Sequence, residues 1–383
     1  MSKYSKRKRP VKIPWKYLLG IILALRVITL LGAILGLRFL SFKPSFPYAD
    51  AVLEIHGSSL LWSWANFDGV HYLLLAEKGY AFGLTQAFFP LYFLLIRWGN
   101  ILINNRLLVG LTVSHLSFIG AIWMFYKLTR LDFSEKTAKK TVLALVLFPT
   151  AFFFLSLYTE SWFLFLLLSS FYLARKKEWI KAGLIGAIAS ASRIIGVFLI
   201  PALLYQWWKN KQKRNLSQLV GAVLPAGGLL AYMIYLQIKF GDPLMFAHVQ
   251  EGFGAGRTTS GFILLYQVFW RYLKMIFTVD PANPIYFTVW LELLSAIFFL
   301  GLLAYAWRKG IRKSYLIFAV FAYLLPTLTG TFSSMPRYVL VLFPAFMVLG
   351  SIKNRYLYWA WITISILLLL ITTMLFTRGY WVA

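Results

Sequence analysis

The feature that most constrains this chain is a series of long apolar runs separated by short basic tracts. A helix that crosses a bilayer needs about 20 apolar residues. The chain has 383 residues, of which 60% are hydrophobic and only 13% charged, whereas about a quarter of a soluble protein is charged. These patterns predict an all-α polytopic membrane protein, a bundle of about eleven transmembrane helices.

We expect one integral membrane domain over residues 1–383, with a basic cytoplasmic tail at 1–16. The first external loop, 38–106, should contain two interfacial helices near 69–79 and 88–103, and a second external loop covers 237–284. The stretch 262–279 of that second loop is an amphipathic segment. The apolar runs predict spanning helices at 17–37, 107–128, 141–157, 161–174, 216–236, 285–306, 314–330, 337–351 and 356–376, with two more inside 179–208.

The distribution of charge predicts the orientation of these helices. The formal net charge is +27, and the basic residues lie in the tracts between apolar runs, as the positive-inside rule describes. We therefore expect a cell-membrane protein with a cytoplasmic N-terminus, whose basic tracts contact anionic lipid headgroups and not nucleic acid. In this threading the loops on the external face carry most acidic residues, which predicts a polar site on that face.

Several kinds of chemistry are excluded or disfavoured by the residues present. The chain has no cysteine, so disulfides, thiol nucleophiles and thiolate metal sites are excluded. Its four histidines form no close pair of the kind that binds zinc. No nucleotide-binding signature stands in its usual strand–loop–helix context. No cofactor is predicted with certainty, although Asp68 and Glu160 could share a divalent cation if they converge.

The segment Trp64–Tyr80 places an Asp, a His and a Glu shortly after the first predicted helix. Asp68 stands at the start of an interfacial helix, where it could cap the backbone of the first turn or act as a catalytic base. The two roles are compatible, because a cap also orients the carboxylate. His71 follows three residues later on the same helical face. It could hydrogen bond to Asp68 or bind a substrate.

Other candidate binding residues lie at predicted turns near the external face. Glu160 stands where one helix turns into the next, and Arg193 lies between the two helices of 179–208. They could form a structural ion pair or bind substrate. Arg337 begins the run 337–351, and its guanidinium suits a phosphate; Tyr338 could close over that phosphate. His248, in the second external loop, could contact a sugar or belong to the loop alone.

Three sequence blocks resemble the PIG-V mannosyltransferase family, in the same order and with similar spacing. They are "FDGVHYLLLAEKGY" followed by "FFPLYFLLIR", the region from "LFPTAFFFLSLYTES" to Arg193, and "FSSMPRYVLVLFPAF". The resemblance covers about residues 15–350. The chain departs from the family pattern at Phe67, where Trp is usual, and at Phe93, where a second Pro is usual.

The resemblance implies a GT-C type helical bundle and a glycosyltransferase whose donor is a polyprenyl-phosphate sugar, typically mannose. It also implies that Asp68 is the essential acidic residue of the first external loop. Asp68 would then take the proton of an acceptor hydroxyl, and cations such as Arg337 and Arg193 would stabilise the leaving phosphate. Attack from the opposite face would invert the anomeric carbon.

The sequence leaves the acceptor open among a glycolipid, a glycan and a protein. A flippase that moves lipid-linked sugars without chemistry is the main alternative, and it predicts charges at mid-depth in the membrane. A protein O-mannosyltransferase and a non-catalytic subunit of a glycosylation complex are further alternatives.

Overall fold

The computed structural model describes residues 12–210, 215–254, 256–258, 261 and 263–382, and every regular element in these ranges is helical. The longer helices are α1 (Trp15–Phe39), α3 (Asp68–Lys78), α4 (Pro90–Ile103), α5 (Arg106–Arg130), α6 (Glu135–Val146), α7 (Glu160–Arg175), α8 (Trp179–Ser190), α9 (Leu199–Lys209), α10 (Leu216–Val223), α11 (Ala226–Phe240), α13 (Leu265–Thr278), α14 (Ile285–Arg308), α15 (Lys313–Thr327), α17 (Phe343–Gly350) and α18 (Arg355–Thr377). The short ones are α2 (Ser59–Trp62), α12 (Met245–His248), α16 (Met335–Tyr338), a π turn at Ala49–Leu53, and 3-10 turns at Glu54–His56, Ser63–Ala65, Thr85–Ala87, Ala151–Leu155, Ile194–Phe198, Val249–Phe253 and Val339–Val341.

Four helices of the described chain, α1, α5, α14 and α18, are long and apolar enough to cross a membrane. The bent pair α10 and α11 would make a fifth if it acts as one span. Further apolar helices such as α4, α8 and α15 are shorter. The chain is therefore a multi-pass membrane protein, while the number of eleven spans stays a prediction.

Three helices that the apolar runs predict as continuous are interrupted in the structure, and a proline stands at each interruption. In 141–157, α6 ends at Val146 and Pro149 precedes a 3-10 turn. In 216–236, α10 and α11 meet at Pro225 with a bend of 46°. In 337–351, Pro344 lies in the first turn of α17. Proline has no backbone N–H and clashes with the preceding turn, so the prediction of unbroken helices is wrong at these places.

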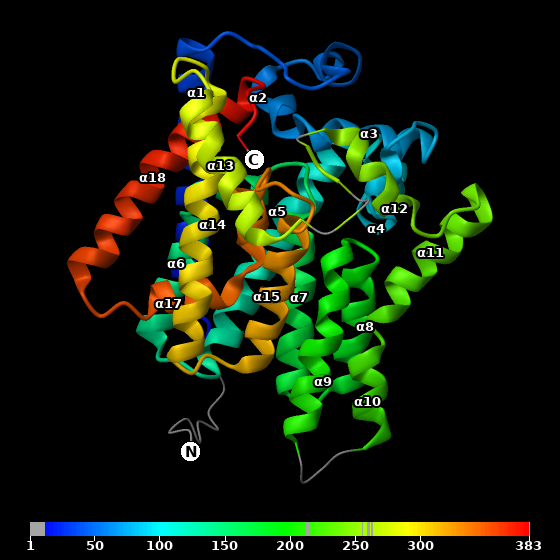
Figure 1. The fold of residues 1–383 in the computed structure, drawn as a ribbon, viewed down its shortest axis with the longest axis vertical. Helices are drawn as coiled ribbons and strands as arrows, with labels where there is room; N and C mark the ends of the chain where they lie inside the picture. Colours follow the sequence, from blue (N-terminus) through cyan, green and yellow to red (C-terminus); the bar gives the residue numbers. More distant parts are fainter. Residues whose placement is uncertain (1–11, 211–214, 255, 259–260, 262, 383) are drawn as a thin grey trace.

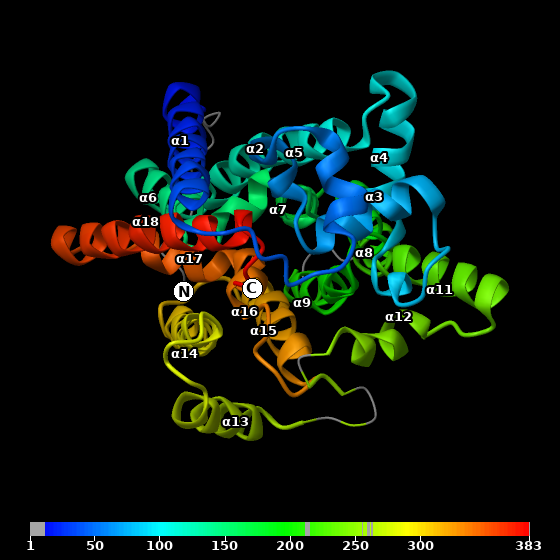
Figure 2. The same cartoon turned by 90° about the horizontal axis from the view of Figure 1, so that it is seen from above.

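The long helices pack side by side, and the short helices gather at one end of the bundle (Figure 1). α5 packs along α7, α1 packs on α18, and α8 packs on α10. The two short helices of 38–106, α3 and α4, have bounds close to those predicted, and they pack against each other. Seen from above, α13 lies at the edge of the bundle beside α14 (Figure 2). Its outer side exposes large apolar side chains: Tyr266, Trp270, Leu273 and Phe277.

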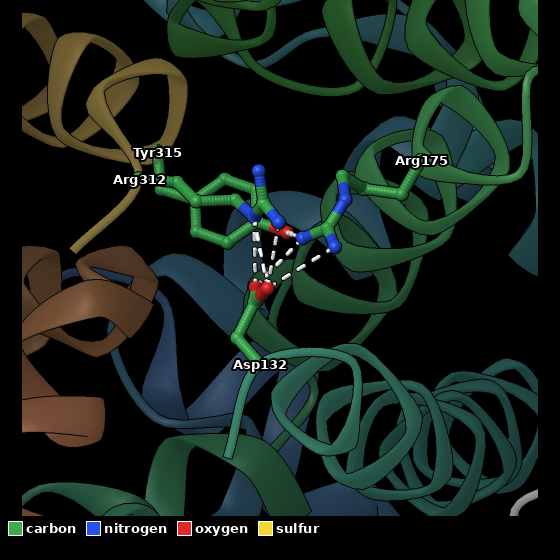
Figure 3. A network of polar contacts seen from close by, with 4 residues as sticks. All are labelled: Asp132, Arg175, Arg312 and Tyr315. Carbon is green, nitrogen blue, oxygen red and sulfur yellow. Dashed lines mark hydrogen bonds and ion pairs between the residues drawn. The ribbon is translucent and has the colours of Figure 1, made fainter. Parts of the chain in front are cut away.

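A partly buried ionic network connects α5, α7 and α15 at one end of the bundle (Figure 3). Asp132, in the turn between α5 and α6, accepts hydrogen bonds from Arg175 at the end of α7 and from Arg312 before α15. Arg175 also donates to the hydroxyl of Tyr315. Glu160 is the first residue of α7 and Arg175 the last. Because a 16-residue helix is about 24 Å long, these two residues mark opposite ends of the bundle.

Candidate active site

A cavity of about 880 Å³ opens at the end of α7 where Glu160 lies. Its wall is made by α3, the starts of α7 and of the turn Ile194–Phe198, α13, α14, α16 and the loop after α12. Six of the seven side chains predicted as site residues line it: Asp68, His71, Glu160, Arg193, Arg337 and Tyr338. Packing therefore brings together groups that lie far apart in the sequence.

Asp68 is positioned by the backbone before it and by a buried tyrosine. It is the first residue of α3, and the residue before it, Phe67, adopts a positive φ of 59°. The backbone N–H of Asp68 donates to the hydroxyl of Tyr158 at 3.2 Å, and that hydroxyl donates to the carbonyl of Asn66 at 2.8 Å. Phe67 occupies the N-cap position, and no side chain caps the helix. The prediction that Asp68 is the N-cap is therefore wrong, and its carboxylate is directed to other partners.

The centre of the site is a row of alternating charges. Arg337 Nη1 donates to Asp68 Oδ2 at 2.5 Å. On the other side of the guanidinium, Arg337 Nε lies 3.6 Å from Glu160 Oε1. Arg193 Nη1 donates to that same oxygen at 2.7 Å. Carboxylates and guanidiniums thus alternate in the order Asp68, Arg337, Glu160 and Arg193.

The members of this row differ in how far they are exposed. The Glu160 side chain is 2% exposed and that of Arg337 9%, whereas the Asp68 side chain is 25% exposed. Glu160 Oε2 and Arg337 Nε are buried without a hydrogen-bond partner among the described residues. Buried polar atoms left without partners are costly. Asp68 is thus the more exposed of the two carboxylates beside Arg337, and Glu160 is the more deeply buried.

The charge of Arg337 governs the protonation of Asp68. Burial is the largest single effect and would raise the pKa of the Asp68 carboxyl, but the charge and hydrogen bond of Arg337, together with smaller contributions from His71 and Arg257, lower that pKa below its usual value. Burial lowers the pKa of His71, and the nearby Asp68 charge opposes this effect only in part. The structure therefore favours an ionised Asp68 beside a neutral His71 near pH 7.

His71 and Tyr338 line the cavity through their rings. The His71 ring lies against Phe88, with centroids 5.1 Å apart, and the structure shows no hydrogen bond from it to Asp68. The Tyr338 ring lies beneath two guanidiniums, with Arg337 at 5.3 Å and Arg193 at 5.9 Å from its centroid. Cation–π contacts of this kind hold arginine side chains in place.

His248 is the predicted site residue that lies outside the cavity wall. It ends α12, and its Nδ1 lies 2.7 Å from Asp242 Oδ2. Its side chain is 57% exposed. Gln250 and Phe253 of the following turn reach the cavity instead.

Polar residues that the sequence analysis did not single out also line the cavity, among them Arg257, Tyr272 and Glu292. The charge of Arg257 acts on Asp68 and lowers its pKa further. Glu292 is the one carboxylate of α14, a helix that is otherwise almost wholly apolar. A lone carboxylate in such a run is expensive in a membrane and marks a functional site by default, so this signal was present in the sequence.

Asp68 and Glu160 do converge, but Arg337 lies between them. Among the residues that the structure describes, no group of three His, Asp or Glu side chains is arranged to hold a metal ion. The two carboxylates therefore do not fit a shared divalent cation while Arg337 keeps this place.

Comparison with known proteins agrees with the sequence resemblance. Residues 42–222 match the family model described as Mannosyltransferase (PIG-V). This segment contains Asp68, His71, Glu160 and Arg193, while Arg337 lies beyond it. No curated protein matches the chain. The family match supports a glycosyltransferase.

One solved structure with a similar arrangement is the oligosaccharyltransferase of Archaeoglobus fulgidus, tethered to an acceptor peptide containing the NVT sequon by a disulfide bond. The sequences are 14% identical and the TM-score is 0.49. The match covers 96% of this chain and 56% of the other, so this chain spans little more than half the length of that protein.

Proposed function

Because residues 42–222 match the PIG-V mannosyltransferase family, we propose that the protein transfers a sugar, in the first instance mannose, from a polyprenyl-phosphate donor to a hydroxyl group. The acceptor is a glycolipid, a glycan or a protein, and the reaction takes place at the external face of the cell membrane. The observation that carries this proposal is the direct pairing of Asp68 with Arg337 in the wall of one cavity.

The cavity has the charges and surfaces that such a donor needs. Four arginines, Arg193, Arg257, Arg271 and Arg337, line it together with three carboxylates, Asp68, Glu160 and Glu292. This excess of guanidinium groups favours an anionic ligand, and guanidinium binds phosphate oxygens well. The wall also contains apolar side chains of α13, α14 and α15, against which a polyprenyl chain can pack: Met275, Val289, Ala322 and Leu325.

In the proposed reaction, the acceptor oxygen forms a bond to the anomeric carbon while the bond from that carbon to the donor phosphate breaks. Asp68 takes the proton of the acceptor hydroxyl as general base. The polyprenyl phosphate leaves with the electron pair, and Arg337 and Arg193 stabilise its developing negative charge. Attack from the face opposite the phosphate inverts the anomeric carbon.

The resting ion pair has a consequence for this mechanism. While Arg337 is bonded to Asp68, the pKa of that carboxyl is low and the carboxylate is a weak base. A donor phosphate that accepts hydrogen bonds from Arg337 competes with Asp68 for the guanidinium. Binding of the donor would thus release the base at the moment when it is needed.

The test is transfer of radiolabelled mannose from polyprenyl-phosphate mannose to membrane lipids and glycans, with the purified protein in lipid nanodiscs. We expect activity from the wild type and a loss of about 10²- to 10⁴-fold in Asp68→Asn, since general-base catalysis contributes about this much. Glu77→Gln is the matched control, because Glu77 lies on the same helix but is exposed and contacts Arg106 at 3.6 Å.

Equal transfer by Asp68→Asn and the wild type would remove Asp68 from the chemistry. If the wild type transfers none of the mannose, glucose and arabinose lipids, the transferase proposal fails. Movement of those intact lipids between leaflets would then support a flippase.

A further inference from the structure

Glu292 lies in the N-terminal third of α14 and is 4% exposed. It lines the same cavity as Asp68. No Lys or Arg of the described chain forms an ion pair with it. A buried carboxylate without a cationic partner is costly unless hydrogen bonds satisfy both of its oxygens.

Both oxygens of Glu292 accept hydrogen bonds from donors on different elements, and Trp381 is a further side-chain partner. The hydroxyl of Tyr272, on α13, donates to Oε2 at 2.5 Å. The backbone N–H of Ser334 donates to Oε1 at 3.1 Å. Glu292 therefore links α13 and α14 to the loop that precedes α16.

Ser334 holds a backbone conformation that serine rarely adopts. Its φ is +67°, in the left-handed region, which costs free energy for a residue other than glycine. Its carbonyl accepts hydrogen bonds from the backbone N–H groups of Arg337 and Tyr338, both at 3.0 Å. Ser334 is thus the residue before α16, and it fixes where this four-residue helix begins.

The chain of contacts runs from Glu292 through Ser334 to Arg337, and from Arg337 to Asp68. A helix of one turn has too few internal hydrogen bonds to hold its own position. Two hydrogen bonds from outside hold α16: the Ser334 N–H donates to Glu292 just before the helix, and the Thr150 hydroxyl donates to the carbonyl of Pro336 within it.

We infer that Glu292 is a positioning residue for the transfer reaction: its carboxylate holds Ser334 in the left-handed conformation and so aims Arg337 at the donor phosphate. The effect of Glu292 on catalysis rests on the proposed function. The effect of Glu292 on the loop 331–338 does not depend on any activity. Glu292 itself need not touch the substrate.

The test compares Glu292→Ala with Glu292→Gln. Glutamine keeps an oxygen for the Ser334 N–H, and its amide group can donate to the Tyr272 hydroxyl, so it should preserve the loop. Alanine removes both hydrogen bonds. The first measurement is amide hydrogen exchange of residues 331–338, with the protein in nanodiscs and without substrate. We expect faster exchange in Glu292→Ala and wild-type exchange in Glu292→Gln.

The second measurement is steady-state transfer. We expect kcat to fall roughly 10- to 100-fold in Glu292→Ala with a smaller change in KM, because a displaced guanidinium chiefly loses its contact with the leaving phosphate. Glu292→Gln should keep most of the activity. Tyr272→Phe removes one hydrogen bond to Glu292 and leaves the bond from Ser334, so its kcat should lie between those of Glu292→Ala and Glu292→Gln. This variant still tests the inference if Glu292→Ala does not fold. Ser295→Ala, a buried position one turn along α14, is the control.

Two results would overturn this inference. One is unchanged exchange of 331–338 in Glu292→Ala. The other is a Glu292→Gln variant as inactive as Glu292→Ala, since that would mean that the negative charge itself acts on the substrate. An inactive wild type would refute the proposed function alone, because the exchange measurement would still decide the role of Glu292.

Discussion

Arg337 is the residue on which the site depends, because it contacts Asp68, faces Glu160 and lies over the ring of Tyr338. Its guanidinium lies between two carboxylates, the half-buried Asp68 and the buried Glu160. Replacing it with lysine would keep the charge but not the planar group that can bond to several partners at once. The position therefore requires arginine for its shape as well as its charge.

Arg337 also sets the pH range in which Asp68 can accept a proton. It lowers the pKa of the Asp68 carboxyl, so the ionised form is present above about pH 4, the usual pKa of an aspartate. We expect kcat/KM of the wild type to lose no activity through Asp68 until the pH falls below about 4. Arg337→Gln removes the main charge that lowers the pKa of Asp68, while burial still raises it. The pKa of Asp68 therefore rises, and the acid limb of kcat/KM moves to higher pH.

The measurement is kcat/KM as a function of pH for the wild type and Arg337→Gln, together with Arg193→Gln. Arg193 contacts Glu160 and not Asp68, so its variant should lose activity without moving the acid limb. An acid limb at the same pH in Arg337→Gln and the wild type would contradict this account.

At the scale of elements, glycines allow α8 and α10 to come into contact. A Cβ at Gly183 would overlap the carbonyl of Gly221, and a Cβ at Gly221 would overlap the carbonyl of Trp179. Backbones that approach this closely leave no room for a side chain. α8 ends just before Arg193, so this contact also supports one arginine of the site.

We therefore expect Gly221→Val to push α8 and α10 apart and to lower the melting temperature of the protein by several degrees, since overpacking costs about 1–3 kcal/mol. Gly227→Ala is the control, because nothing lies within 4 Å of a Cβ at that position of α11. Thermal unfolding in nanodiscs measures both. Equal melting temperatures for the two variants would show that the contact does not contribute to stability.

The ionic network at Asp132 should also stabilise the arrangement of helices. Its side chain is 12% exposed and accepts hydrogen bonds from Arg175 and Arg312. Asp132 and Arg175 are half-buried, whereas the Arg312 side chain is 43% exposed. The cost of losing Asp132 should therefore lie between about 0–1 kcal/mol for an exposed pair and about 3–5 kcal/mol for a buried one. Asp132→Asn should therefore lower the melting temperature by a few degrees while sparing KM, since the network lies at the far end of α7 from the cavity.

Glu178→Gln is the matched control for Asp132→Asn. Glu178 pairs with Lys181 on the surface, where both side chains are largely exposed, and exposed pairs contribute little. If Asp132→Asn unfolds at the same temperature as Glu178→Gln, the network at Asp132 does not contribute to the stability of the fold.

At the scale of the whole molecule, the two polar ends of the bundle should lie on opposite sides of the membrane. The cavity end is expected outside and the Asp132 end in the cytoplasm, because the basic tracts follow the positive-inside rule. The chain has no cysteine, so single cysteines can report this directly. Asn283→Cys, in the exposed loop before α14, should react in intact cells with a maleimide that cannot cross membranes.

Lys309→Cys, at the exposed other end of α14, should react with the same reagent only after the cells are opened. The reverse pattern would place the cavity in the cytoplasm and would contradict the proposed external reaction. Labelling of both positions in intact cells would mean that α14 does not span the membrane.

The amino-acid sequence was sufficient for the properties that depend on local composition. Apolar runs of this length leave helices as the way to satisfy backbone polar groups in lipid, so the all-helical, multi-pass class followed from the sequence. The short helices α3 and α4 followed from their interrupted apolar patterns. Asp68 stood out as a charged residue beside an apolar run, where a charge is costly. Arg337 stood out because it begins an apolar run and its guanidinium suits a phosphate.

Only the tertiary structure decided how these groups meet. Asp68 and Arg337 are 269 positions apart in the sequence, and no local pattern indicates that one would bond the other. The same holds for the place of Arg337 between two carboxylates, for the surface position of His248, and for the hydrogen bonds of Glu292. The physical reason is that composition determines whether a segment is helical and apolar, whereas the packing of all helices together determines which polar groups become neighbours in a space from which water is largely excluded.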